Sequence, residues 1–208
     1  MKRMKYTEEN SNIMHEIGHF IMYTLWISQN KEIDRNYFNN RIFEISIVEN
    51  ENSFGRVVVN NKISVDTFCV KLTYLSGVLF SLGYVEHPDM LWWFDDKWQI
   101  KKNFIEVYNK FGGSSDLLWI LKNIRAADSN YIAIYIYELK KFIQIIRKDE
   151  TIRKIVHQLY KGLQKNKHLS GDQCYSIIKP HIQKLKILGR QIYNPITKIK
   201  INAKAILF

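Results

Sequence analysis

His15-Glu16-Ile17-Gly18-His19 lies within an apolar run that extends from Ile13 to Met22. On an α-helix, His15 and His19 project from one face a single turn apart, so both imidazoles can reach the same metal ion. Glu16 flanks that face, where its carboxylate can contact a water on the metal without being a ligand. This spacing is typical of a zinc metallopeptidase in which Glu16 is the general base. The alternative interpretation is two partnered histidines on a buried structural helix.

The metal interpretation requires the segment to be helical, and its flanks agree. Thr7 precedes two glutamates, which is the pattern of an N-cap followed by an acidic first turn. We therefore expect a helix from about Glu8 to Ile27. The apolar surroundings would provide the dry shell that strengthens electrostatic interactions at a metal.

Composition places the chain among globular proteins of one domain. It has 208 residues, of which 46% are hydrophobic, enough for a substantial core. The sequence shows neither an uninterrupted apolar run of about 20 residues nor an apolar signal core after Met1. We therefore expect a soluble cytoplasmic protein without a transmembrane segment, in which Cys69 and Cys174 are reduced and buried.

The net charge of +11 is concentrated at one end of the chain. Residues 161–208 contain ten lysines and arginines but only one acid, Asp172. Such a face can attract nucleic acid, an acidic partner or a membrane surface, although a solvated basic face is the simpler interpretation. Because the sequence contains no recognised nucleic-acid motif, nucleic acid is not the expected partner.

Periodicity predicts a mainly α-helical domain with a small β-hairpin. Apolar and polar residues alternate over 41–49 and 54–59, on either side of a polar turn, which predicts the two strands of the hairpin. Residues 29–40 are polar and are predicted to form a connection. Helices are predicted from Ser64 to about Leu82 and over 97–111, 116–127, 131–147, 150–163 and 170–185. The aromatic group Leu91-Trp92-Trp93-Phe94, within 83–96, is expected to form a buried plug or a partner-binding patch. Residues 189–208 could form a loose tail or a docking strand.

A catalytic zinc ion needs a third protein ligand besides two histidines. The metzincin pattern is excluded, because Met22 and Leu25 occupy the positions of its later glycine and histidine. Glu32 and Glu44 are poorly placed, in a polar connection and a predicted strand. Asp116 stands out because it follows Gly112-Gly113-Ser114-Ser115 and opens an amphipathic helix, and Asp128 is the weaker alternative.

The order of these motifs resembles the peptidase domain of FtsH-type zinc proteases over roughly residues 6–185. The resemblance rests on His-Glu-x-Gly-His at 15–19, Phe54-Gly55, Leu75-Ser76-Gly77 and Gly-x-x-Asp-Leu at 113–117. It implies that His15, His19 and Asp116 bind zinc and that Glu16 is the base. It also implies a zincin-like helical fold and a homo-oligomer.

The chain departs from that family in three respects, of which one is the longer distance from residue 81 to Asp116, made up by the tryptophan-rich region 84–111. It contains no Gly-x-x-x-x-Gly-Lys-Ser/Thr string, and Ser76-Gly77-Val78-Leu79-Phe80-Ser81 replaces the family's Gly-Gly-Arg-Ala-Ala-Glu. We therefore expect a zinc peptidase domain over 1–188 and a basic C-terminal tail over 189–208. The expected activity is ATP-independent cleavage of flexible or unfolded polypeptides. The alternative functions are a non-catalytic interaction module and, less favoured, a nucleic-acid-binding protein.

Overall fold

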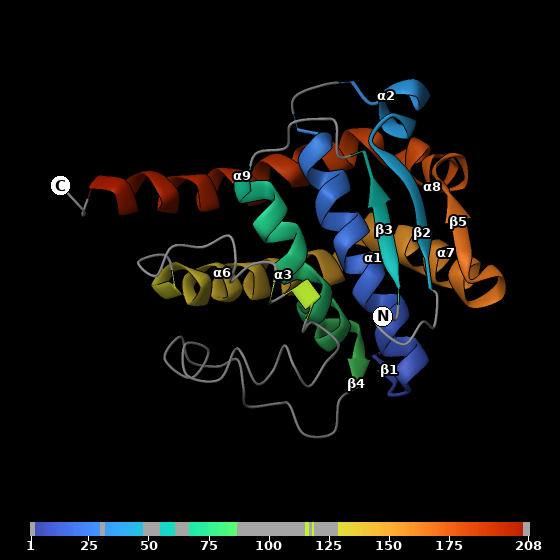
Figure 1. The fold of residues 1–208 in the computed structure, drawn as a ribbon. Coiled ribbons are helices and arrows are strands. Elements are labelled where there is room, and N and C mark those ends of the chain that lie inside the picture. The colour runs from blue at the N-terminus through green and yellow to red at the C-terminus, as the bar shows by residue number, and fades with distance from the viewer. Residues whose placement is uncertain are drawn as a thin grey trace.

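The computed structural model describes residues 3–29, 32–47, 55–60, 67–86, 115–116, 118 and 129–205. These residues form a mainly helical fold with a small β component, as predicted (Figure 1). The elements are β1 (Met4–Lys5), α1 (Glu8–Ile27), α2 (Arg35–Asn39), β2 (Ile42–Ser46), β3 (Arg56–Val59), α3 (Thr67–Tyr84), β4 (Val85–Glu86), α6 (Ser129–Lys148), α7 (Glu150–Asn166), β5 (His168–Ser170), α8 (Gly171–Ile178), the 3₁₀ helix η2 (Lys179–His181) and α9 (Ile182–Ala205).

Helix α1 lies at the centre of the molecule, between α3 on one side and strands β2 and β3 on the other (Figure 1). It also packs on α7 and α9. The Thr7 hydroxyl accepts a hydrogen bond from the backbone N–H of Asn10 at 3.0 Å, which caps the helix where the sequence predicts its start. Fifteen of its 20 residues are buried, so α1 is a core helix and not an amphipathic surface helix.

Helices α1 and α3 approach closely because Gly18 has no side chain. A Cβ atom on Gly18 would lie 2.5 Å from the Phe80 Cβ, too close for any real contact. The Ser76 hydroxyl donates to the Gly18 carbonyl at 3.2 Å, and Ser11 and Ser81 exchange a hydrogen bond at 2.9 Å. Ser76 and Gly77 therefore lie where α3 packs closely on α1.

The main sheet contains the predicted hairpin and one further strand. Strands β2 and β3 are antiparallel, with Ile45 opposite Val57, and β5 joins the other edge of β2. The predictions from the sequence include no strand at 168–170, where β5 lies. Among the described strands β3 pairs with β2 alone and is therefore an edge strand. A second pair, β1 and β4, is parallel.

The C-terminal part differs most from the prediction. The single helix expected over 170–185 is divided into α8, η2 and α9, and Pro180 lies at the start of the 3₁₀ turn between the two α-helices. Residues 189–205, expected as a loose tail or a strand, instead continue α9. Gly189 packs against the Leu25 carbonyl, and the Tyr193 hydroxyl donates to the Met22 carbonyl at 3.2 Å.

Several other expectations can be placed on the described residues. Helices α6 and α7 confirm the predictions over 131–147 and 150–163, with small shifts at their ends. Cys174 is buried, which raises the pKa of its thiol to about 12. Ser115, Asp116 and Leu118 are helical, while most of the regions predicted over 84–111 and 116–127, and the Cys69 side chain, lie outside the described residues. Within the described chain, no helix combines the length and apolarity needed to cross a bilayer.

Replacing Gly18 with alanine should separate α1 from α3. Alanine normally stabilises a helix relative to glycine, but here its Cβ would overlap Phe80, and such overpacking costs about 1–3 kcal/mol. Chemical denaturation in the presence of a chelator would measure the loss. Gly162→Ala in α7 is the control, because its Cβ would meet only the movable end of the Leu169 side chain. Equal stability of Gly18→Ala and the wild type would contradict this packing.

Candidate metal centre

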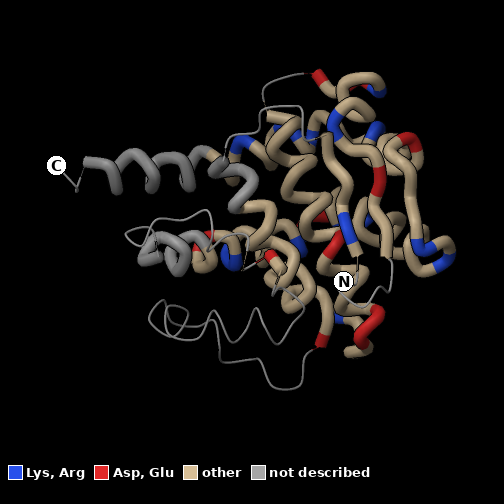
Figure 2. The backbone as a smooth tube through the Cα atoms, viewed as in Figure 1, with Lys and Arg blue, Asp and Glu red and all other residues tan. Residues whose placement is uncertain are grey.

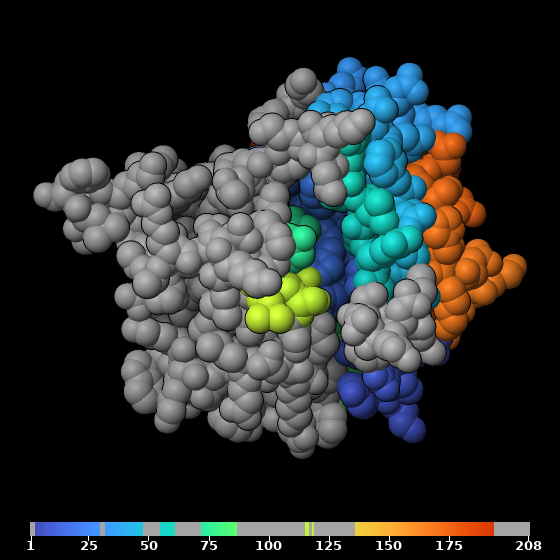
Figure 3. Space-filling view, viewed as in Figure 1, coloured from blue at the N-terminus to red at the C-terminus, as the bar shows by residue number. Residues whose placement is uncertain are grey.

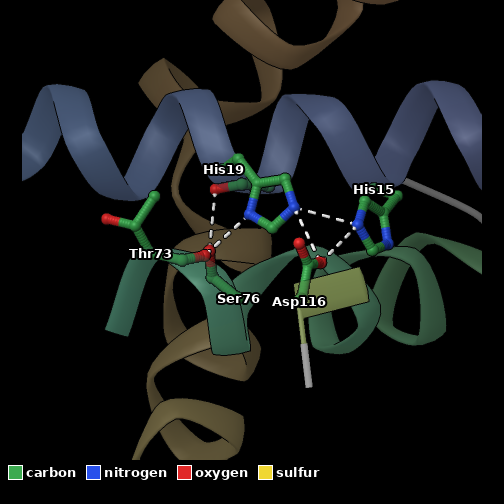
Figure 4. Close-up of polar contacts among 6 residues, drawn as sticks. His15, His19, Thr73, Ser76 and Asp116 are labelled. Atoms are coloured by element: carbon green, nitrogen blue, oxygen red, sulfur yellow. Dashed lines mark hydrogen bonds and ion pairs between the residues drawn. The ribbon is translucent and has the colours of Figure 1, made fainter. Parts of the chain in front are cut away.

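His15, His19 and Asp116 converge on one point between α1 and the helical residues around 116 (Figure 4). The Asp116 Oδ2 atom lies 2.9 Å from His15 Nε2 and 3.1 Å from His19 Nε2. The two Nε2 atoms are 2.9 Å apart. Each of the three residues is no more than 8% exposed. Three ligand atoms that meet in a buried space could together hold one metal ion.

The orientation of His19 is fixed by the backbone of α3. Its Nδ1 atom lies 2.7 Å from the Thr73 carbonyl, and a carbonyl only accepts, so Nδ1 carries the proton (Figure 4). The Nε2 atom therefore points toward Asp116 and is the atom that can bind a metal. Metal-binding histidines commonly donate their other nitrogen to a carbonyl in this way. On His15, the buried Nδ1 has no hydrogen-bond partner among the described residues.

Gly77 provides the space in which the two imidazoles meet. A Cβ atom at this position would lie 2.6 Å from His19 Nε2 and 2.7 Å from His15 Nε2. Any side chain on this residue of α3 would thus occupy the place of the ligand atoms. The sequence alone does not show that Gly77 faces the histidines.

Glu16 lies beside this group without belonging to it. It is 6% exposed, and a Cβ atom on Gly55, just before β3, would come within 2.6 Å of its Cγ atom. Burial raises the pKa of Glu16, and the neighbouring His19 and His15 offset part of that increase. In the space-filling view, atoms of α1 are visible in a hollow between β3 and residues 115–118 (Figure 3). The carboxylate is therefore on the helix that forms the floor of this hollow.

The electrostatics of the group are those of a site that holds a positive charge. Burial lowers the pKa of His19, but the Asp116 carboxylate outweighs this effect, and the pKa rises to about 9. Burial raises the pKa of Asp116, yet His19 and His15 bring it well below its usual range. In the metal-free protein, a proton on His19 thus neutralises the carboxylate. A metal cation would replace that proton, so protons and metal ions compete for the group.

The structure brings together the four residues that the sequence singles out, His15, Glu16, His19 and Asp116. Of the rejected alternatives, Glu44 contacts Arg56 and His168 on the sheet, and Glu32 is exposed. Asp128 lies outside the described residues. Sequence reasoning missed the Thr73 carbonyl, which has no sequence signal because every residue carries such a group.

Gly77→Ala should abolish metal binding while leaving the fold largely intact. The new methyl group would displace the histidine ligand atoms, and it faces the site and not a packed apolar contact. Metal content after dialysis, measured by elemental analysis, should fall from about one ion per chain to near zero. The far-ultraviolet circular dichroism spectrum should be unchanged. Gly162→Ala is again the matched control, and full metal content in Gly77→Ala would contradict the arrangement in Figure 4.

Comparison with known proteins assigns no family to the chain. No family model, curated protein or solved structure matches it. The conclusion that this site could hold a metal ion therefore depends on the ligand atoms, their distances and their burial in this chain.

Proposed function

We propose that this protein is a zinc-dependent metallopeptidase that cleaves polypeptides by hydrolysis. The observation that supports this most strongly is the convergence of His15 and His19 with Asp116, which lies 101 residues from His15 in the chain. A buried carboxylate, Glu16, lies beside the three ligand atoms. Two imidazoles, one carboxylate and an adjacent base form the set of groups that a zinc peptidase uses.

The donor set fits zinc, which in catalytic sites takes three protein ligands and leaves one position open. Zinc bonds to nitrogen and oxygen of about 2.0–2.1 Å place tetrahedral ligands about 3.3 Å apart. The ligand atoms here are separated by 2.9–3.1 Å, so they need to spread by only a few tenths of an ångström. Two histidines and one carboxylate also suit ferrous iron. With iron, this donor set is typical of oxygenases, which need no carboxylate base. Glu16 beside the ligands therefore favours hydrolysis, for which zinc supplies the Lewis acid.

Bound zinc would supply Lewis-acid chemistry, polarising both a water and the scissile carbonyl. Glu16 takes a proton from the attacking water as its oxygen bonds to the carbonyl carbon. It then passes that proton to the nitrogen of the leaving amine as the carbon–nitrogen bond breaks. Gly55 keeps the backbone close to Glu16, which holds the carboxylate beside the ligands. The Thr73 carbonyl holds His19 in the required orientation.

Glu16→Gln should remove the activity and retain the metal. The amide cannot accept the proton, and loss of a general base lowers kcat about 10²–10⁴-fold. Cleavage of unfolded casein without ATP, together with zinc content per chain, would test this. Glu8→Gln, an exposed change on the same helix, is the control and should cleave casein at the wild-type rate. Wild-type protein that contains no zinc would refute the proposal, as would equal cleavage by Glu16→Gln.

The substrate is proposed to be an extended polypeptide that pairs with the open edge of β3. This strand starts beside Glu16, and among the described strands its second edge has no partner. An extended peptide can add to such an edge through main-chain hydrogen bonds. Only flexible or unfolded segments can adopt this conformation without a motor, which fits an ATP-independent enzyme. The resemblance to FtsH-type peptidase domains, the zincin-like fold and a homo-oligomeric assembly belong to the same proposal.

Two proline variants of β3 would test the substrate edge. Amides of adjacent residues in a strand point to opposite edges, so one of Val57 and Val58 donates toward β2 and the other toward the open edge. Val57→Pro and Val58→Pro each remove one amide. One variant should lose thermal stability, and the other should keep its melting temperature but show a raised KM for casein. An unchanged KM in the stable variant would contradict pairing at this edge.

The alternative function is an interaction module that keeps the metal without catalysis. Retention of a buried Glu16 disfavours it, because binding a metal needs no base. Zinc-loaded protein that cleaves neither casein nor short peptides would favour the module. The described lysines and arginines are scattered over several elements (Figure 2), which gives little support to nucleic-acid binding.

A further inference from the structure

A pocket distinct from the candidate metal centre lies between the C-terminal ends of α3 and α6. The apolar part of its lining comes from Leu79 and Leu82 on α3 and from Ile143 on α6. Its cationic part comes from Arg3, Lys140 and Arg147. The pocket has a volume of about 70 Å³. A single water needs roughly 10–15 Å³ by the same measure, so there is room for a small chemical group.

The position of Arg3 follows from the pairing of the two short strands. Strand β1 lies parallel to β4, with Met4 opposite Val85, which brings the residue before β1 to the end of α3. Arg3 is half-buried, and its Nε atom is buried with no hydrogen-bond partner among the described residues. A buried donor of this kind is costly unless a ligand or water satisfies it.

The second guanidinium of the pocket is held by the backbone. The Arg147 Nη1 atom donates to the Gly83 carbonyl at 2.7 Å, which fixes the side chain across the end of α3. Burial, and then repulsion from Arg147, lower the pKa of Arg3, and Glu86 offsets only part of this decrease. Both guanidinium groups line this one pocket, where their like charges repel each other. An anion between them would relieve that repulsion and satisfy the buried donor.

We propose that this pocket binds a carboxylate that is carried on a short apolar group. The carboxylate accepts hydrogen bonds from Arg3 and Arg147, and the apolar group packs on Leu79, Leu82 and Ile143. A carboxylate suits the site better than a phosphate dianion, because removing water from a doubly charged group in a small and partly apolar pocket costs more than removing it from a singly charged one. Two sources carry this chemistry: a free aliphatic carboxylate and the C-terminus of a peptide that ends in an apolar residue.

Calorimetric titration of the full-length Glu16→Gln protein with hexanoate would test the proposal without interference from peptide hydrolysis. Hexanoate should bind, whereas hexanol and hexylamine should bind at least tenfold more weakly, because they lack the anion. A peptide ending in Leu-Leu with a free carboxylate, compared with its C-terminal amide, distinguishes the two sources. Binding of the free peptide but not of hexanoate identifies a peptide terminus as the ligand, and the reverse identifies a free carboxylate.

Two variants assign the binding to this pocket. Arg3→Gln should weaken binding of the preferred probe about tenfold or more, since charge-assisted hydrogen bonds are lost. Leu82→Phe should fill the pocket and abolish binding. Because Leu82 is only half-buried, the melting temperature of this variant should be unchanged. Lys161→Gln removes one positive charge from an exposed position on α7, as Arg3→Gln does from the pocket, and it should leave binding unchanged. The proposal is overturned if no carboxylate binds, if both pocket variants bind as the wild type does, or if hexyl phosphate binds more tightly than hexanoate.

Discussion

The structure depends on burying two imidazoles and two carboxylates against one pair of helices. Burying an ionised group costs several kcal/mol unless another charge or hydrogen bond compensates. Here Asp116 contacts both imidazoles, and the Thr73 carbonyl accepts the remaining His19 proton. This compensation works only if α3 comes close to α1, and Gly18 and Gly77 allow that approach. The fold and the candidate metal centre are therefore maintained by the same helix contact.

The sequence predicts the parts of the fold that local chemistry specifies. Thr7 caps α1 where its hydroxyl is expected, and alternation along β2 and β3 gives the hairpin. The histidine spacing is also local, since residues four apart in a helix always share a face. Asp116 is a different case, because it lies far from the histidines in the chain. Asp116 is predicted as the third ligand from its place after Gly112-Gly113-Ser114-Ser115 and from the resemblance to FtsH-type peptidase domains. In the structure its carboxylate lies beside both imidazoles.

The sequence does not predict the contacts that form between distant segments. Strand β5 has only three residues, and no local pattern marks it, because its stability comes from pairing with β2. Residues 189–193 alternate weakly and resemble a tail, yet Gly189 and Tyr193 pack on α1 and make them helical. The short helix α2 depends on the Asp34 cap within a polar segment. The errors at β5 and at 189–193 arise where tertiary packing overrides local preference, whereas the Asp34 cap of α2 is a local signal within the expected polar connection.

The separation of the ligands along the chain has a thermodynamic consequence. A metal ion bound to His15, His19 and Asp116 would cross-link the chain across 101 residues. The entropy cost of closing a loop grows only with the logarithm of its length, and each doubling adds about 0.6 kcal/mol. A change in the number of residues between His19 and Asp116 therefore alters the entropy of closing this loop by little. The spacing from His15 to His19 has no such tolerance, because one inserted residue would turn the second imidazole by about 100° around the helix.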